Sequence, residues 1–136
     1  MKVAFVAALA LAVSGCGAYQ FGGGAATPSP ALATVSGHVV AVPCAPVEKV
    51  GSPCAGRPVA NLEIDYVAGA TVEARTLTNA DGSYAVALKP GSYTVRFKNS
   101  LMRVISGPLS LTLAAGSNVT ANYTLDSGIR VPAPAQ

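Results

Sequence analysis

Residues 77–97 read LTNADGSYAVALKPGSYTVRF, and their pattern indicates the class of fold. Apolar and polar side chains alternate along two short segments, 84–88 and 93–97, and turn-forming residues precede each segment. A period of two residues is typical of a β-strand that buries one face, whereas a helix would repeat every three to four residues. The stretch therefore predicts two consecutive strands with tight turns before them.

Both turns have residues suited to a structural role. Asn79 and Gly82 tolerate positive φ, and Asp81 between them can accept hydrogen bonds from the turn backbone. Pro90 and Gly91 suit the two central positions of the second turn. Calcium binding is the alternative for the first turn, but one Asp and one Asn offer fewer oxygens than a hard cation needs. We expect Asp81, Gly82, Pro90 and Gly91 to be structural, and we expect no metal.

The same alternation recurs on both sides of this stretch. Further strands are expected at 34–42, 62–66, 72–76, 109–113 and 119–123, with Gly- and Pro-containing turns between most of them and no helical repeat. About seven short strands in succession predict an all-β fold, an antiparallel seven-stranded β-sandwich. We expect one domain over residues 34–126, which is long enough for a single core.

The N-terminus has the features of a secretory signal. Residues 1–15, MKVAFVAALALAVSG, contain one Lys, then an uncharged apolar run from Val3 to Val13, then small residues. The run is too short to span a bilayer, which needs about 20 helical residues. We interpret residues 1–15 as a signal peptide.

The last residues of this segment, together with Cys16, form the sequence VSGC. This motif resembles the lipobox of bacterial lipoproteins, which implies that Cys16 becomes the first mature residue and carries a diacylglyceryl group. Two or three acyl chains hold a protein at a membrane far better than one. The alternative is ordinary cleavage nearby, after Gly15 or Ala18, with no lipid. The resemblance predicts an extracytoplasmic protein anchored in the bacterial cell envelope, on the outer membrane or on the outer face of the plasma membrane.

The other two cysteines, Cys44 and Cys54, then remain as a pair in an oxidising compartment, where disulfides persist. A structural zinc site needs about four ligands, and His38 is the single histidine of the chain. A redox pair normally has two residues between its cysteines. We therefore predict a Cys44–Cys54 disulfide, and we predict neither a metal nor a cofactor.

Composition limits the domain boundaries and the classes of partner. Residues 16–33 are rich in Gly, Ala and Pro and predict a flexible tether, and residues 127–136 predict a disordered Pro-rich tail. Nine Lys and Arg include Lys2 of the signal, so eight basic residues face six acidic ones in the mature chain. They form no basic cluster, which argues against nucleic-acid binding.

Four segments of the domain resemble the carboxypeptidase regulatory-like domain, a transthyretin-like sandwich related in architecture to the immunoglobulin-like folds. They are VSGHV, GRPVANLEIDYV, the stretch LTNADGSYAVALKPGSYTVRF and a final strand. The chain departs from that family at Asn61 and Leu62 and by its long Cys44–Cys54 insertion. The resemblance implies a fold but no activity, because such domains serve as noncatalytic accessories in many surface proteins.

No catalytic constellation is evident. His38 is the one obvious base at neutral pH, and no nucleophile motif accompanies it. We expect a noncatalytic binding or structural module, not an enzyme, with the membrane and an unknown envelope protein or glycan as its partners. The chain has no Trp, which weakens the case for a sugar-stacking face. A small extracytoplasmic enzyme or ligand carrier of transthyretin-like fold, using His38, stays open as the alternative.

Overall fold

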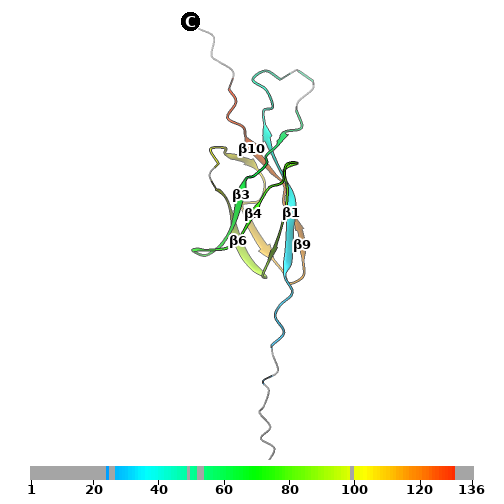
Figure 1. Cartoon of the computed structure of the whole chain (residues 1–136), viewed down its shortest axis with the longest axis vertical. Helices are drawn as coiled ribbons and strands as arrows, with labels where there is room; N and C mark the ends of the chain where they lie inside the picture. Colours follow the sequence, from blue (N-terminus) through cyan, green and yellow to red (C-terminus); the bar gives the residue numbers. More distant parts are fainter. Residues whose placement is uncertain (1–23, 25–26, 49, 52–53, 99, 131–136) are drawn as a thin grey trace, which may run out of the picture.

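A computed structural model describes residues 24, 27–48, 50–51, 54–98 and 100–130 of this chain (Figure 1). These residues form two β-sheets that face each other, and they contain no helix. Within the same residues, nothing helical is long and apolar enough to cross a bilayer. The all-β, sandwich-like architecture expected from the alternating pattern is confirmed.

The described part of the chain contains ten strands. They are β1 (Ala33–Val42), β2 (Arg57–Pro58), β3 (Glu63–Ala68), β4 (Thr71–Leu77), β5 (Ser83–Leu88), β6 (Gly91–Lys98), β7 (Val104–Ser106), β8 (Ser110–Leu113), β9 (Asn118–Thr120) and β10 (Tyr123–Asp126).

The first sheet is built around β1. The first half of β1 pairs with β5 and β9, its second half pairs with β2 and β10, and β7 joins the far side of β10. The pairs with β9 and β10 are parallel. The prediction of seven strands, all antiparallel, is therefore wrong in both respects. The expected last strand divides into β9 and β10, and both of these run in the direction of β1.

The second sheet has the order β4-β3-β6-β8 and is antiparallel throughout. Its strands alternate as the sequence predicts: along β6, Tyr93 and Val95 are buried while Thr94 and Arg96 are exposed. Alternation of this kind gives each sheet one apolar face, and the two apolar faces pack against each other to form the core.

The core is aliphatic with a group of tyrosines at its centre. Its buried hydrophobic residues are Ala33, Val35, Val39, Ala41, Leu62, Ile64, Tyr66, Tyr84, Leu88, Tyr93, Val95, Leu111, Leu113, Ala121, Tyr123 and Leu125. The Tyr84 hydroxyl donates to the carbonyl of Ala121, and the Tyr93 hydroxyl donates to the carbonyl of Lys89 at 2.8 Å. Both rings are thus core residues whose polar ends are satisfied by backbone.

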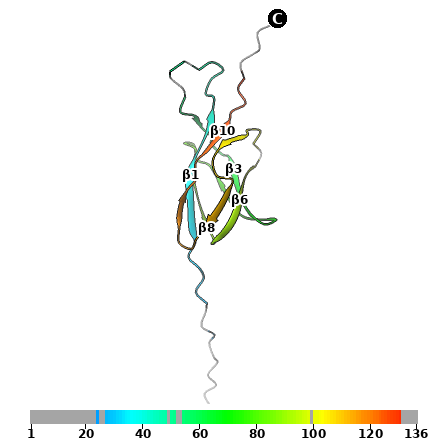
Figure 2. The same cartoon turned by 180° about the vertical axis from the view of Figure 1, so that it is seen from behind.

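The sandwich has two distinct ends, and β1 runs from one to the other (Figures 1 and 2). The chain enters at Ala33 at what we call the entry pole. We call the opposite end the loop pole; it holds the segment with Cys44 and Cys54, residues 100–103 and residues 127–130 (Figures 1 and 2). Backbone hydrogen bonds from Ser127 to Val42 and from Asp126 to Arg103 join these segments.

Candidate functional site

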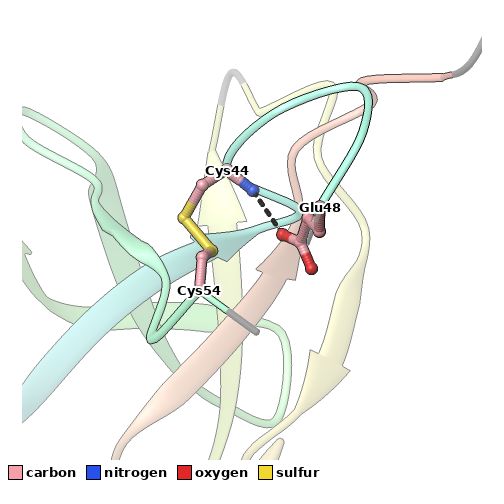
Figure 3. A group of neighbouring side chains, drawn as sticks. All are labelled: Cys44, Glu48 and Cys54. Atoms are coloured by element: carbon pink, nitrogen blue, oxygen red, sulfur yellow. Dashed lines mark hydrogen bonds between the residues drawn. A yellow bond between two sulfur atoms is a disulfide. The ribbon is translucent and has the colours of Figure 1, made fainter. Parts of the chain in front are cut away.

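The most distinctive local feature is the bridged segment at the loop pole. Cys44 and Cys54 form the predicted disulfide, with their Cα atoms 6.0 Å apart. Glu48 lies inside the bridged segment, and its Oε1 accepts a hydrogen bond from the Cys44 N–H at 3.0 Å (Figure 3). On the other side, the Gly56 N–H donates to Cys54 Sγ at 3.3 Å. The disulfide therefore braces a segment that leaves β1 and returns to β2.

The same three side chains include the donor atoms of a possible metal site. The two sulfurs and a carboxylate oxygen of Glu48 all lie within 4.8 Å of one another. A metal ion binds cysteine as the thiolate, and both sulfurs are already used in the disulfide. The oxidised bridge thus leaves only the carboxylate to act as a ligand, and the cluster is best explained as a braced loop.

A cavity of about 320 Å³ opens at the ends of β1 and β2, the two strands that the bridged segment connects. We call it the pole pocket; it is lined by Ala41, Arg57, Pro58, Val59, Ala60, Met102 and Ser127. Arg57 is opposite Ala41 in the pairing of β1 with β2. Residues directly opposite each other share a face of the sheet, and Ala41 faces the core with 4% of its surface exposed. The register therefore places Arg57 on the side of the sheet that faces the other sheet, where the sandwich ends.

The arginines of the loop pole differ in their electrostatic environment. Arg130 Nη2 binds Asp126 Oδ2 at 2.7 Å. The hydrogen bond from Arg130, helped by the backbone N–H of Gly128, lowers the pKa of Asp126 to about 2. Among the residues that the structure describes, no carboxylate lies within ion-pair distance of Arg57. Arg57 thus brings an uncompensated positive charge to a pocket whose lining is otherwise mainly apolar.

The candidate base His38 lies elsewhere, on an exposed position of β1 opposite Ser83. The Ser83 hydroxyl donates to Asp81 Oδ1 at 2.6 Å and accepts a hydrogen bond from Asn79 Nδ2 at 3.0 Å. The hydrogen bond from this hydroxyl is the main reason why the pKa of Asp81 falls below its usual range. The hydroxyl is therefore directed at a carboxylate rather than at the imidazole, which is not the geometry of a nucleophile beside its base.

The residues to which the sequence assigned structural roles are dispersed. Asp81 and Gly82 form the turn between β4 and β5, where Gly82 has φ +77° and its N–H donates to the carbonyl of Asn79. Pro90 lies in the turn between β5 and β6 at the entry pole, and Gly91 is the first residue of β6 (Figures 1 and 2). Cys16 lies outside the described residues. The structure thus brings together the two bridging cysteines and leaves the two turns separate.

Sequence reasoning missed Arg57 and the pole pocket. An isolated Arg between Gly56 and Pro58 has no periodic pattern around it, and β2 is only two residues long. The one available signal was the match of GRPV to the second segment of the family pattern, which implies a fold and no binding residue. The pocket depends on the register between β1 and β2, which the sequence does not reveal.

Comparison with protein-family models and with curated proteins finds no significant match for this chain. Its function must therefore be argued from its own residues and geometry.

Proposed function

We propose that this protein is a lipid-anchored module of the bacterial cell envelope, and that it binds a partner noncatalytically through its loop pole. Within this proposal, Cys16 carries the lipid, and the tether expected over residues 16–33 ends at residue 32 because Ala33 is the first residue of β1. We infer that the sandwich is a transthyretin-like, carboxypeptidase regulatory-like domain, and this assignment rests on the sequence pattern described above. The compartment is extracytoplasmic, and the Cys44–Cys54 disulfide is consistent with an oxidising environment.

One observation carries the proposal, namely the opposition of the two poles along β1. The tether joins the sandwich at Ala33, and the bridged segment begins just beyond Val42 at the other end of the same strand (Figure 1). A strand of this length spans about 33 Å, and a flexible tether of this length adds about 20 to 25 Å. The loop pole would then stand about 55 Å from the lipid. This placement presents it to partners in the envelope.

The surface of the loop pole supports a role in binding. Val47, Val50 and Leu101 are exposed hydrophobic residues there, and Leu101 is fully exposed at 106%. Single exposed apolar residues are ordinary, but two of these lie within the disulfide-bridged segment, and Leu101 is next to Met102, which lines the pole pocket. A rigid segment loses less conformational entropy on binding than a flexible one, so a disulfide at this position favours recognition.

Site-specific photo-crosslinking in the cells that make the protein tests this proposal. A photoreactive phenylalanine analogue at Leu101 of the full chain is expected to give a discrete crosslinked product. The matched control carries the analogue at Ala115, which is exposed in the turn between β8 and β9 at the entry pole. Equal products from both positions, or a product only from Ala115, would contradict the proposal.

The alternative, an enzyme or carrier that uses His38, is distinguished by His38→Ala. Because the His38 side chain is exposed on the outer side of β1, the variant is expected to fold normally and to keep its Leu101 crosslink. An activity or a ligand that is lost with this substitution alone would favour the alternative.

A further inference from the structure

The pole pocket has the composition of a small selective binding site. Its walls are Ala41, Pro58, Val59, Ala60 and the thioether side chain of Met102. Ser127 also lines it, but its hydroxyl already donates to the carbonyl of Pro43 at 2.8 Å. The guanidinium of Arg57 is thus the strong polar donor that the pocket offers to a ligand. Apolar walls with a few placed polar groups are typical of ligand sites.

We propose that the pole pocket binds the C-terminus of a partner polypeptide that ends in an apolar residue. The inference rests on the proposed function, because it names the partner chemistry of the loop pole. The terminal carboxylate would pair with Arg57, whose planar group can bind both carboxylate oxygens at once. The last side chain would lie against Pro58, Val59 and Met102.

The number of charges favours a carboxylate over a phosphate. A phosphate group carries nearly two charges and three acceptor oxygens at neutral pH, and sites for it gather several cationic or N–H donors. Among the residues that the structure describes, the lining of the pole pocket contains a single cationic residue, Arg57. One guanidinium matches the one charge and two oxygens of a carboxylate.

The size and position of the pocket favour a chain end over an internal acidic residue. The pocket lies where the sandwich ends, and its inner wall includes the buried Ala41. Its volume of about 320 Å³ is at the lower limit for ligand pockets. A chain end can enter such a site from one side, and it carries its carboxylate and its last side chain on the same carbon atom. An internal residue would need room for the chain on both sides.

Methyl NMR of the full chain in lipid nanodiscs tests the proposal. The sequence contains two methionines, Met1 and Met102, so selective ¹³C labelling of methionine methyl groups gives one reporter inside the pocket. The probes are N-acetyl-L-leucine and N-acetyl-L-leucinamide, which differ only in the carboxylate. The Met102 signal is expected to shift saturably with the acid, and the amide should bind about tenfold more weakly because it lacks the charged hydrogen bonds.

Two arginine variants complete the test. Arg57→Gln is expected to abolish the preference for the acid, and Arg103→Gln should keep it. Arg103 is exposed at the same pole but does not line the pocket, so it controls for general loss of positive charge. An unchanged ligand-free Met102 signal in both variants would establish that the pocket is intact.

Other outcomes would overturn the inference. A carboxylate site at Arg57 would be excluded if the acid and the amide bind equally or if the Met102 signal does not shift. It would also be excluded if Arg57→Gln and Arg103→Gln reduce the preference for the acid to the same extent. A Met102 shift that follows protein concentration without any probe would assign the pocket to a second copy of the chain. If any of these occurs while the Leu101 crosslink persists, only the C-terminal ligand fails. Loss of the Leu101 crosslink would instead contradict the proposed function itself.

Discussion

Three buried tyrosines, Tyr66, Tyr84 and Tyr123, differ in whether their hydroxyl groups have a hydrogen-bond acceptor. Burial raises the pKa of each one well above its ordinary value. Tyr84 donates to the carbonyl of Ala121, and Tyr123 donates to the carbonyl of Pro108 at 2.8 Å. The nearby Tyr84 hydroxyl offsets part of the rise in the pKa of Tyr66, but the Tyr66 hydroxyl makes no hydrogen bond of good geometry with any described residue. Only this hydroxyl is buried without compensation in the described part of the core.

Removing these hydroxyls one at a time should therefore have opposite consequences. Tyr66→Phe is expected to leave the free energy of unfolding unchanged or to raise it by up to about 1 kcal/mol, because it removes an unpaired polar group. Tyr84→Phe is expected to lower it by about 1 to 2 kcal/mol, because the Ala121 carbonyl loses its donor. Urea unfolding of both variants measures the difference. A larger loss for Tyr66→Phe than for Tyr84→Phe would show that Tyr66 has a partner that the geometry does not reveal.

Two turn glycines allow backbone strain to be separated from steric packing. Gly69 has φ +60° and a Cβ there would meet nothing within 4 Å, whereas Gly82 has φ +77° and a Cβ there would collide with the carbonyl oxygen of Val39. Gly69→Ala should destabilise the protein by about 1 to 2 kcal/mol through backbone strain. Gly82→Ala should cause a similar backbone strain. It should lower the free energy of unfolding by about 1 to 3 kcal/mol more, because the new methyl group is overpacked against the Val39 carbonyl oxygen. Thermal and urea unfolding provide the comparison, and equal losses would mean that the turn moves to accommodate the methyl group.

At the scale of elements, the sequence predicted strands well where side chains alternate and poorly elsewhere. Residues 84–88 and 93–97 lie within β5 and β6, as their period of two residues indicates. The strands β2 and β7, with two and three residues, are too short to show any period. Alternation also carries no information about direction, so the parallel pairing of β9 and β10 with β1 could not be predicted.

The candidate site was predictable to the same limited extent. The disulfide followed from counting cysteines in a chain that is expected to be exported, because two remaining cysteines allow a single pairing. Arg57 becomes a candidate binding residue only because it is paired opposite Ala41 and because Met102 lines the same pocket. Met102 lies far from Arg57 along the chain, and such a long-range approach has no local sequence pattern.

The end of β10 should respond to acid through Asp126. Pairing with Arg130 lowers the pKa of Asp126 from 3.8 to about 2. A carboxylate with a lowered pKa in the folded state contributes stability that is complete above its ordinary pKa and is lost as the pH falls towards the folded value. The difference in free energy of unfolding between the unchanged protein and Asp126→Asn should therefore be constant at neutral pH and shrink between about pH 4 and pH 2. Urea unfolding across this range measures it.

Arg130→Gln provides the control for this pH dependence. It removes the main cause of the shift and keeps the hydrogen bond from the Gly128 N–H to Asp126, which is 2.9 Å long. The pKa of Asp126, measured by NMR of its carboxyl carbon, should then move back towards 3.8. A pKa that stays near 2 would show that the backbone, and not Arg130, sets it.

The bridged segment should contribute stability through the unfolded state. Cys44→Ser combined with Cys54→Ser is expected to lower the free energy of unfolding by about 2.5 to 3 kcal/mol, because the unfolded chain regains the freedom of a loop of about 11 residues. Urea unfolding of the double variant tests this value. Dithiothreitol should produce a similar loss in the unchanged protein and none in the double variant. No loss in either case would mean that the loop is held by its other contacts, among them the Glu48 hydrogen bond to Cys44.

At the scale of the whole molecule, the position of a region relative to the N-terminus determines how the proposed lipid anchor would orient that region. The braced segment lies at one end of β1, and the chain arrives at the other end (Figure 1). The pole pocket, which Ala41 and Arg57 line, is at the same end of β1 as the braced segment. If lipid is attached ahead of the tether, this arrangement orients the pocket away from the membrane. If lipid is absent, the same sandwich has no preferred orientation. The proposed function therefore depends on Cys16 more than on any residue of the sandwich.

Intact-mass spectrometry of the protein extracted from its native membrane tests that dependence. The mature mass should correspond to a chain that begins at Cys16 and carries acyl chains, and reduction should add only the mass of two hydrogens from the Cys44–Cys54 bridge. Cys16→Ser should eliminate the acyl mass, whereas the matched Cys44→Ser and Cys54→Ser double variant should retain it, because only the first substitution removes the sulfur that bears the lipid. A lipid-free chain that begins after Gly15 or Ala18 would contradict the lipobox interpretation. In that case the sandwich would still bind through its loop pole, but as an exported protein without a fixed orientation, and the separation of its poles along β1 would no longer argue for the proposed function.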